Sequence, residues 1–399
     1  MELIEVILSK ENLNRAYKKV VANKGASGVD GVTVEELGDY IRENREKIVT
    51  SLRNRTYIPK PVRRVYIPKD NGKKRPLGIP TALDRTIQQV IAQPISDIYE
   101  EIFSDYSYGF RAGRSCHDAI RQALEYLNDG YEWVVDIDIE QFFDKVNHDK
   151  LIQILREQVN DSTTLNLIRK YLKAGVMENG LEKATITGVP QGSVISPLLA
   201  NIYLNTLDRL WEKYGLTHGI LVRYADDTVI ICKNKKSANH ALNLLQYIMA
   251  KLDLKLHPVK TKIISMWDGK EGFDFLGMHH RRMTTETRKG QLYKEAYQYP
   301  SRKAMKKMKA EVKRNVNRRS LLVAKEEDLI KNLNPKITGW KNYYSTKRNE
   351  KWMRALDWYI ICTFTRWYNK KHQRRNHMSK VGFVRNSIYG RGLKKMAGA

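Results

Sequence analysis

Residues 220–232 of this 399-residue chain read ILVRYADDTVIIC. Two apolar stretches, 220–224 and 228–232, flank a short acidic turn, and their β-branched residues are typical of strands. A turn of this length between two such stretches predicts a β-hairpin with Asp226 and Asp227 at its tip. Because aspartates commonly cap hairpin turns, the pair by itself leaves a structural role open.

A second acidic strand is predicted at residues 133–139, which read WVVDIDI and carry Asp136 and Asp138. A carboxylate beside apolar strands costs desolvation energy unless something compensates its charge. Mg²⁺ is a suitable compensator because it prefers oxygen ligands. If this strand and the hairpin are neighbours in one sheet, their carboxylates converge. Two ions about 3.5–4 Å apart could then clamp the oxygens of a phosphoryl transfer.

The remaining pattern mixes helices and strands. A hairpin is predicted at 61–80 with its turn at 70–72, and further strands at 260–266 and 273–279. This order predicts an α+β fold with a mostly antiparallel sheet, followed by an almost wholly helical region after residue 301. The predicted helices lie at 10–22, 34–53, 81–102, 148–175, 196–213 and 237–253.

The net charge of +27 comes from 71 Lys+Arg against 44 Asp+Glu. Residues 301–399 hold 27 basic and 6 acidic side chains, a net charge of +21, so residues 1–300 carry only +6. A phosphate-rich partner is the natural interpretation of such an excess, since each neutralised phosphate releases counterions. The last quarter of the chain is therefore the predicted electrostatic clamp on nucleic acid.

The three cysteines, Cys116, Cys232 and Cys362, are far apart. They form no Cys-x-x-Cys pair, which argues against a zinc module and against a disulfide framework. The first residues show no signal peptide, and no apolar stretch approaches the length of about 18 residues that spans a bilayer. We therefore expect a cytoplasmic or nucleoid-associated protein that contacts no membrane.

Taken together, the motifs resemble the group II intron-encoded reverse transcriptase (maturase) family over about residues 10–370. The stretches that carry this resemblance are GVDG at 28–31, RVYIPK at 64–69 with KKRPLGIPT at 73–81, YGFR at 108–111, DIEQFFD at 138–144, GVPQG at 188–192 with SPLLAN at 196–201, YADD at 224–227, FLG at 275–277 and ITGWKNYY at 337–344.

The resemblance implies a right-hand polymerase fold with fingers, a palm containing the antiparallel sheet, and an α-helical thumb. We expect the fingers and an N-terminal extension at 1–130 and the palm, with some finger elements interleaved, at 131–290. The maturase-specific thumb follows at 291–349 and a basic nucleic-acid-binding segment at 350–399. The zinc-containing endonuclease domain of many relatives is not expected, because the chain ends without the necessary Cys/His pairs.

The same resemblance assigns the metal site. Asp138 lies five positions before Phe143, the spacing between metal ligand and aromatic gate in the family, whereas Asp136 does not. The implied ligands of two Mg²⁺ ions, with Mn²⁺ able to substitute, are Asp138, the Ile139 carbonyl, Asp226 and Asp227. Lys260 is the candidate proton donor to pyrophosphate, with Lys262 as the alternative.

The implied nucleotide contacts lie on the fingers and palm. Phe143 would collide with a 2′-OH and favour dNTPs, although a core role beside Phe142 is its other interpretation. Lys69 and Arg75 flank the fingers turn, where cations can meet a triphosphate, and Arg63 lies close by. Gln191 corresponds to a nucleotide-contacting glutamine in the family.

The basic helical end supplies the candidate nucleic-acid contacts. A cationic helix face followed by aromatic rings suits RNA backbone and bases, although we expect about half of such rings to be thumb core. The candidates are Arg302, Lys303, Lys306, Lys307, Arg314, Trp340 and Tyr344.

The implied function is RNA-directed DNA polymerisation with intron RNA binding, splicing and retrohoming. The expected partners are a structured intron RNA template, a DNA primer or target and dNTPs, and the resemblance also allows a homodimer. Two alternatives stay open here. One is a related reverse transcriptase recruited to DNA repair or defence, and the other is an RNA-binding splicing factor without polymerase activity.

Overall fold

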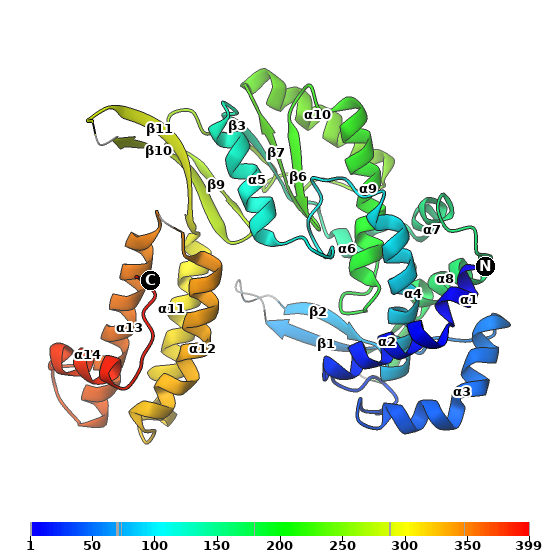
Figure 1. The fold of residues 1–399 in the computed structure, drawn as a ribbon, viewed down its shortest axis with the longest axis horizontal. Helices are drawn as coiled ribbons and strands as arrows, with labels where there is room; N and C mark the ends of the chain where they lie inside the picture. The colour runs from blue at the N-terminus through cyan, green and yellow to red at the C-terminus, as the bar shows by residue number, and fades with distance from the viewer. Residues whose placement is uncertain are drawn as a thin grey trace. The chain divides into compact units, whose positions relative to one another are not determined.

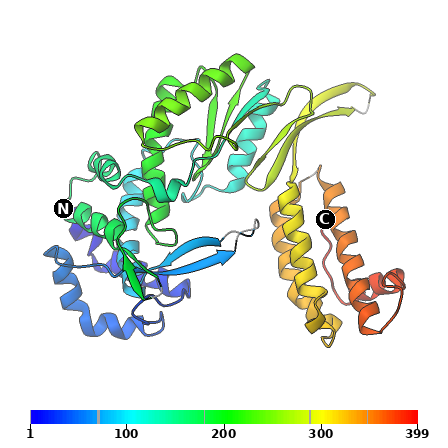
Figure 2. The same cartoon turned by 180° about the vertical axis from the view of Figure 1, so that it is seen from behind.

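The computed structural model describes residues 2–68, 72, 74–178, 180–286, 289–346 and 348–398. The chain divides into two compact units. The first unit comprises Met1–Ala119 and Val134–Ile263, and the second comprises Ile120–Trp133 and Ile264–Ala399. The ribbons in Figures 1 and 2 show the elements of each unit.

The N-terminal helices of the first unit pack around α4. Its N-cap is Thr81, whose hydroxyl accepts from the Asp84 amide at 3.0 Å. Asn12 is buried in α2 and donates to the carbonyls of Ile7 and Val90, which joins three helices. These elements are α1 (Leu3–Ile7), α2 (Lys10–Ala22), α3 (Leu37–Arg53) and α4 (Ala82–Glu100).

A four-stranded sheet in the order β2-β1-β4-β5 contains the predicted 61–80 hairpin. The antiparallel register of β1 and β2 pairs Arg64 with Gly78, and β1 runs parallel to β4. Of the predicted turn at 70–72, only Gly72 lies among the described residues. The strands are β1 (Val62–Pro68), β2 (Lys74–Ile79), β4 (Val176–Glu178) and β5 (Leu181–Lys183).

The second sheet of this unit has the order β6-β7-β3-β8 and contains the opening hairpin. The strands β6 and β7 pair antiparallel, with Tyr224 opposite Asp227. Helices α9 and α10 lie beside this sheet (Figure 1). The elements are β3 (Trp133–Ile137), α9 (Ser196–Tyr214), β6 (Ile220–Tyr224), β7 (Asp227–Cys232), α10 (Lys235–Lys251) and β8 (Lys262–Ser265).

The predicted helix at 148–175 is two helices, α7 (His148–Arg156) and α8 (Ser162–Lys173). The single-helix prediction was wrong because the Asp161 carboxylate caps α8, accepting from the amides of Thr163 and Thr164 at 2.8 and 3.2 Å. Such a cap satisfies amides that begin a new helix. The short α6 (Phe142–Lys145) precedes this pair, and α5 (Cys116–Asn128) crosses the boundary between the two units.

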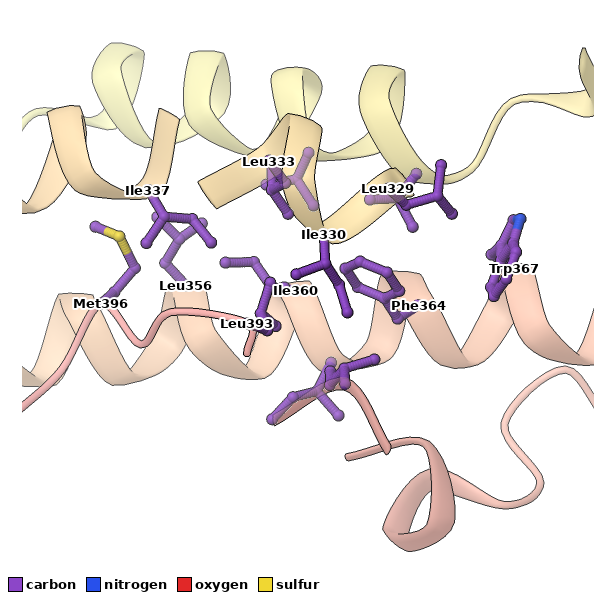
Figure 3. Packing of buried hydrophobic residues seen from close by; sticks show 14 of the residues in the cluster. Leu329, Ile330, Leu333, Ile337, Leu356, Ile360, Phe364, Trp367, Leu393 and Met396 are labelled. Carbon is purple, nitrogen blue, oxygen red and sulfur yellow. The ribbon is translucent and has the colours of Figure 1, made fainter. Parts of the chain in front are cut away.

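The second unit begins with the sheet β11-β10-β9 and continues as helices. The apolar side chains of α12 and α13 face each other in Figure 3, and Leu393 and Met396 join them from the C-terminal stretch. This core unites residues on both sides of position 349, where the sequence suggested a boundary. The elements are β9 (Gly272–Phe275), β10 (Met278–Glu286), β11 (Leu292–Pro300), α11 (Arg302–Val316), η1 (Arg319–Leu321), α12 (Glu326–Tyr344), α13 (Glu350–Lys371) and α14 (Val381–Gly390).

The predicted mixture of helices and sheets with a helical C-terminal region is therefore confirmed. Among the described residues, no helix has both the length and the apolar character needed to cross a bilayer.

Candidate active site

The acidic turn joins β6 to β7. Ala225 adopts a left-handed conformation with φ of 56°, which lets the chain reverse within two residues. Asp226 is half-buried, whereas Asp227 is exposed at the first position of β7. The two neighbouring carboxylates therefore lie in different environments.

Asp138 lies directly after the end of β3 and is half-buried. Its backbone is fixed from the segment before β8. The amide of His257 donates to the Asp138 carbonyl at 2.8 Å, and the Asp138 amide donates to the Thr261 hydroxyl at 3.3 Å. The strands β3 and β7 are neighbours in the sheet, so the condition under which the two acidic strands lie side by side is met.

Electrostatics couples the two strands. Burial raises the pKa of Asp226, and the negative charge of Asp138 raises it further, while Arg75 and Arg223 act in the opposite direction. The Lys260 Nζ lies 3.0 and 3.1 Å from the two carboxylate oxygens of Asp138. The Lys260 ammonium therefore compensates the negative charge of Asp138, which would otherwise repel the carboxylate of Asp226.

The side chains of Asp138, Asp226 and Asp227 are chemically suited to bind a divalent metal ion. Two neighbouring strands carry carboxylate oxygens, the ligand type that Mg²⁺ prefers, and the Lys260 ammonium shows that the Asp138 carboxylate accepts a cation. The described part of the chain nevertheless contains no group of three or more His, Cys, Asp or Glu side chains close enough to form a ready-made metal site. The roles of Asp138, Asp226, Asp227 and the Ile139 carbonyl as metal ligands stay predictions.

Arg75 and Gln191 form a pair. The Arg75 Nε donates to the Gln191 Oε1 at 2.8 Å, and the Gly78 amide donates to the Gln191 carbonyl at 2.7 Å. The loop at 190–192 thus lies along β2 and orients the Arg75 guanidinium, whose positive charge lowers the pKa of Asp226. This geometry supports a joint role at an anionic group.

The other predicted fingers cations are placed differently. Arg63 donates through Nε and Nη2 to the Ser27 carbonyl, at 3.1 and 2.7 Å, and so ties β1 to the N-terminal extension. Its contact with a triphosphate stays a prediction. Lys69 lies outside the described residues.

Phe143 lines a cavity of about 120 Å³ together with Arg64, Gly78 and Gln191. Its ring is half-buried and meets Phe142 edge-on, with centroids 5.2 Å apart. The Val189 amide donates to the Phe143 carbonyl at 2.7 Å, which fixes the backbone. Phe142 is the core residue of the two, which leaves Phe143 available for the gate role.

The candidate nucleic-acid residues belong to the second unit. Helix α11 buries Ala304, Met308, Val312 and Val316 and exposes basic side chains on its other face. The exposed candidates are Arg302, Lys303, Lys306, Lys307 and Arg314, the last paired with Glu311. The rings of Trp340 and Tyr344 are instead partly buried against the helical core, so their contact with RNA stays a prediction.

Sequence reasoning missed Arg223, which has no exposed surface. It forms a buried ion pair with Asp208 of α9. The signal was present, because Arg223 is the one cation in an otherwise apolar strand. A charge at such a position needs a specific partner.

Comparisons with known proteins decide the family. A family model described as "Reverse transcriptase (RNA-dependent DNA polymerase)" matches residues 67–280. The chain belongs to the reverse transcriptase family. A second family model, "Group II intron, maturase-specific domain", matches residues 305–382 of this reverse transcriptase.

Two curated relatives agree with this assignment. The chain is 36% identical to "Protein YkfC" of Escherichia coli (strain K12) over 328 residues, which cover 73% of this chain and 85% of that protein. It is 44% identical to "Group II intron-encoded protein LtrA" of Lactococcus lactis subsp. cremoris over 195 residues, which cover 49% of this chain and 32% of LtrA. The aligned part thus spans most of YkfC but only about a third of LtrA.

A solved chain of a "Partial Cas6-RT-Cas1--Cas2 complex" aligns with a TM-score of 0.39 and 22% identity, covering 63% of this chain and 43% of that chain. The family matches are more informative than this superposition. They identify the protein as an RNA-directed DNA polymerase with a maturase region, which implies divalent metal and nucleic-acid substrates. They do not favour recruitment to repair or defence, nor a splicing factor without polymerase activity.

Proposed function

We propose that this reverse transcriptase adds dNTPs to a primer 3′-OH opposite an RNA template, with Asp138, Asp226 and Asp227 as the ligands of two Mg²⁺ ions, for which Mn²⁺ can substitute. The observation that carries the proposal is the position of Asp138 and Asp226 on neighbouring strands, where the charge of Asp138 raises the pKa of Asp226. When bound, such ions neutralise charge on the attacking and leaving oxygens.

The surrounding side chains would then act on the nucleotide. Arg75, oriented by Gln191, binds the triphosphate and stabilises charge on the leaving pyrophosphate. Lys260 would release the Asp138 carboxylate to the metal ion and transfer a proton to the pyrophosphate, since its ammonium lies beside that carboxylate. Phe143 excludes the 2′-OH of an rNTP from the cavity that it lines.

Further contacts to the dNTP come from Lys69, Arg63 and the Ile139 carbonyl, which would also reach a metal ion. Their support is the family pattern of the fingers hairpin and the first palm motif, to which residues 64–69 and 138–144 correspond.

The second unit would bind the structured intron RNA. The exposed cations of α11 and the net charge of +21 over residues 301–399 support a large phosphate-rich partner. We propose that this binding assists splicing and that DNA synthesis at a DNA target completes retrohoming. The proposed division is fingers at 1–130, palm at 131–290 and thumb at 291–349, with a nucleic-acid-binding segment at 350–399 that shares its hydrophobic core with the thumb. We also propose that the protein acts in the bacterial cytoplasm, that it associates with the nucleoid when its substrate is DNA, and that it forms a homodimer.

Primer extension on poly(rA)/oligo(dT) with Mg²⁺ tests the polymerase proposal. We expect the wild type to extend the primer and Asp226→Ala to abolish extension without weakening the binding of structured RNA. Asp39→Ala is the matched control, because Asp39 is an exposed carboxylate that pairs with Arg42 on α3. A wild type that binds structured RNA tightly but extends no primer would contradict the proposal.

A further inference from the structure

A buried guanidinium lies directly behind the acidic turn. Arg223 has none of its surface exposed, and its five N–H groups all meet acceptors. Nε donates to Asp208 Oδ1 at 2.8 Å, and Nη1 donates to Asn201 Oδ1 at 3.1 Å and to the Ala225 carbonyl at 2.9 Å. Nη2 donates to the Ser107 hydroxyl at 2.7 Å and also to Asp208 Oδ2. Every hydrogen-bond donor of the Arg223 guanidinium therefore has an acceptor.

The partners of Arg223 come from rigid elements. Asp208 and Asn201 are both buried and lie seven residues apart on α9, which places them on one face of the helix. The Asn201 amide also donates to the Gly109 carbonyl at 2.6 Å. One helix thus holds both the guanidinium and the loop that follows α4.

The backbone repeats these connections. The Arg223 amide donates to the Tyr106 carbonyl, and the Tyr108 amide donates to the Arg223 carbonyl, each at 2.9 Å. Loop, strand and helix therefore form one hydrogen-bonded block on the buried side of the turn.

The Ala225 carbonyl is the link between this block and the site. It belongs to the peptide that joins Ala225 to Asp226, so an acceptor bond to Arg223 fixes the plane from which the Asp226 side chain departs. Ala225 is also a non-glycine residue with φ of 56°, a conformation that needs support from its surroundings.

We propose that Arg223, Asp208 and Asn201 are positioning residues for DNA synthesis: they hold the Ala225–Asp226 peptide so that the Asp226 carboxylate points at the reacting phosphate. The inference rests on the role proposed above for Asp226. The competing interpretation is a buried ion pair that only stabilises the fold, which would affect unfolding but not the rate of nucleotide addition.

The variants must keep the fold. Removal of the whole Arg223 side chain would leave the Asp208 charge buried without a partner, which is strongly destabilising. Arg223→Lys retains the positive charge but cannot reproduce the planar fork that reaches Asp208 and Ala225 together. Asn201→Ala removes a hydrogen bond to Arg223 without removing either member of the buried ion pair. Tyr171→Phe is the matched control, since it removes a buried hydroxyl of α8 that donates to Asp84 at 3.1 Å in the same unit.

The experiment uses the full chain and four readouts. These are the thermal unfolding midpoint, the affinity for primer–template, the rate and KM of single dTTP addition, and Mn²⁺ binding followed by electron paramagnetic resonance with a dideoxy-terminated primer. We expect Asn201→Ala and Arg223→Lys to lower the maximal rate about tenfold or more and to weaken Mn²⁺ binding, with primer–template affinity unchanged. Tyr171→Phe should lower the unfolding midpoint and leave rate and Mn²⁺ affinity at wild-type values.

Wild-type rate and Mn²⁺ affinity in a folded Asn201→Ala or Arg223→Lys variant would overturn the inference. An equal loss of rate in Tyr171→Phe would overturn it too, because stability alone would then explain the effect. The Asp226→Ala variant distinguishes a failure of the proposed function from a failure of the positioning inference. If that variant polymerises normally, the proposed function fails. If it is inactive while the other variants behave as wild type, only the positioning inference fails.

Discussion

Gly109→Ala perturbs the active site through a backbone contact. Gly109 is buried in the loop after α4, and its conformation is one that alanine also adopts, so the effect depends on space. An added Cβ would lie 2.9 Å from the Tyr224 carbonyl carbon and 3.2 Å from the Ala225 Cα, and closer still to the Ala225 amide nitrogen. Ordinary contact begins at 3.4 Å.

The displacement follows from these distances. Relief of the clash with Tyr224 alone needs a movement of about 0.5 Å, and the nearer nitrogen raises this toward about 1 Å. The loop cannot retreat freely, because its Gly109 carbonyl is held by Asn201 at 2.6 Å. We therefore expect the acidic turn to take up much of the displacement. A misplacement of about 1 Å costs about 100-fold in rate, which equals about 2.7 kcal/mol of transition-state stabilisation.

The assay is single-nucleotide addition under pre-steady-state conditions, with primer–template affinity and unfolding measured in parallel. We expect the rate of Gly109→Ala to fall between about tenfold and about 100-fold, and its stability to fall by about 1–3 kcal/mol through overpacking. Gly382→Ala is the control, since its added Cβ meets open space in α14. A Gly109→Ala enzyme with wild-type rate and stability would refute the rigid contact between loop and turn.

Three further predictions concern the sugar gate, a buried histidine and the basic helix. Phe143→Ala should raise rNTP incorporation relative to dNTP by about tenfold or more, because a methyl group no longer excludes the 2′-OH; unchanged discrimination in single-nucleotide assays would remove the gate assignment. His280 is completely buried, and burial, followed by the neighbouring His279, lowers its pKa from 6.5 to about 3. The unfolded chain therefore takes up this proton first, so stability present above pH 6.5 is lost as pH falls toward 3, by about 1.4 kcal/mol per unit. Unfolding free energies of wild type and His280→Phe should diverge in this way between about pH 7 and about pH 4, and parallel pH profiles would contradict it. Replacement of Lys303, Lys306 and Lys307 by Gln should reduce the slope of log affinity for RNA against log salt by about 2–3; an unchanged slope would mean that this face of α11 does not meet phosphate.

The local sequence pattern was sufficient to predict the β6–β7 hairpin and strand β3. Apolar β-branched residues on either side of a short acidic turn predict both strands without any distant contact, and they are where the sequence predicts them. The helix at 148–175 was wrong because its periodicity continues across a position where Asp161 starts a new helix. A cap of one residue is a weaker signal than an apolar stripe.

The long-range contacts could not be read from local pattern. Lys260 meets Asp138 across 122 positions and Arg75 meets Gln191 across 116, so no periodicity links either pair. The same limit hid the partners of Arg223, although the lone cation in an apolar strand showed that some partner had to exist. In the second unit, α13 and α14 of the basic C-terminal stretch contribute Ile360, Phe364 and Ile388 to the core that Figure 3 shows in part. The net charge of this stretch predicts that the exposed faces of its helices are basic, but it does not predict which of their side chains are buried in the core.

The central claim is that Asp138 and Asp226 hold the divalent metal together. When Fe²⁺ replaces Mg²⁺, added hydrogen peroxide oxidises it to Fe³⁺ and releases a hydroxide ion and a hydroxyl radical, and ascorbate reduces the iron again. The radicals cut a polypeptide near the bound ion, and the cleavage sites can be mapped on the full chain. The account predicts cuts near residues 138 and 226 that excess Mg²⁺ suppresses and that Asp226→Ala removes from both positions. Cuts at only one of the two, or cuts that neither Mg²⁺ nor the substitution affects, would contradict a shared site.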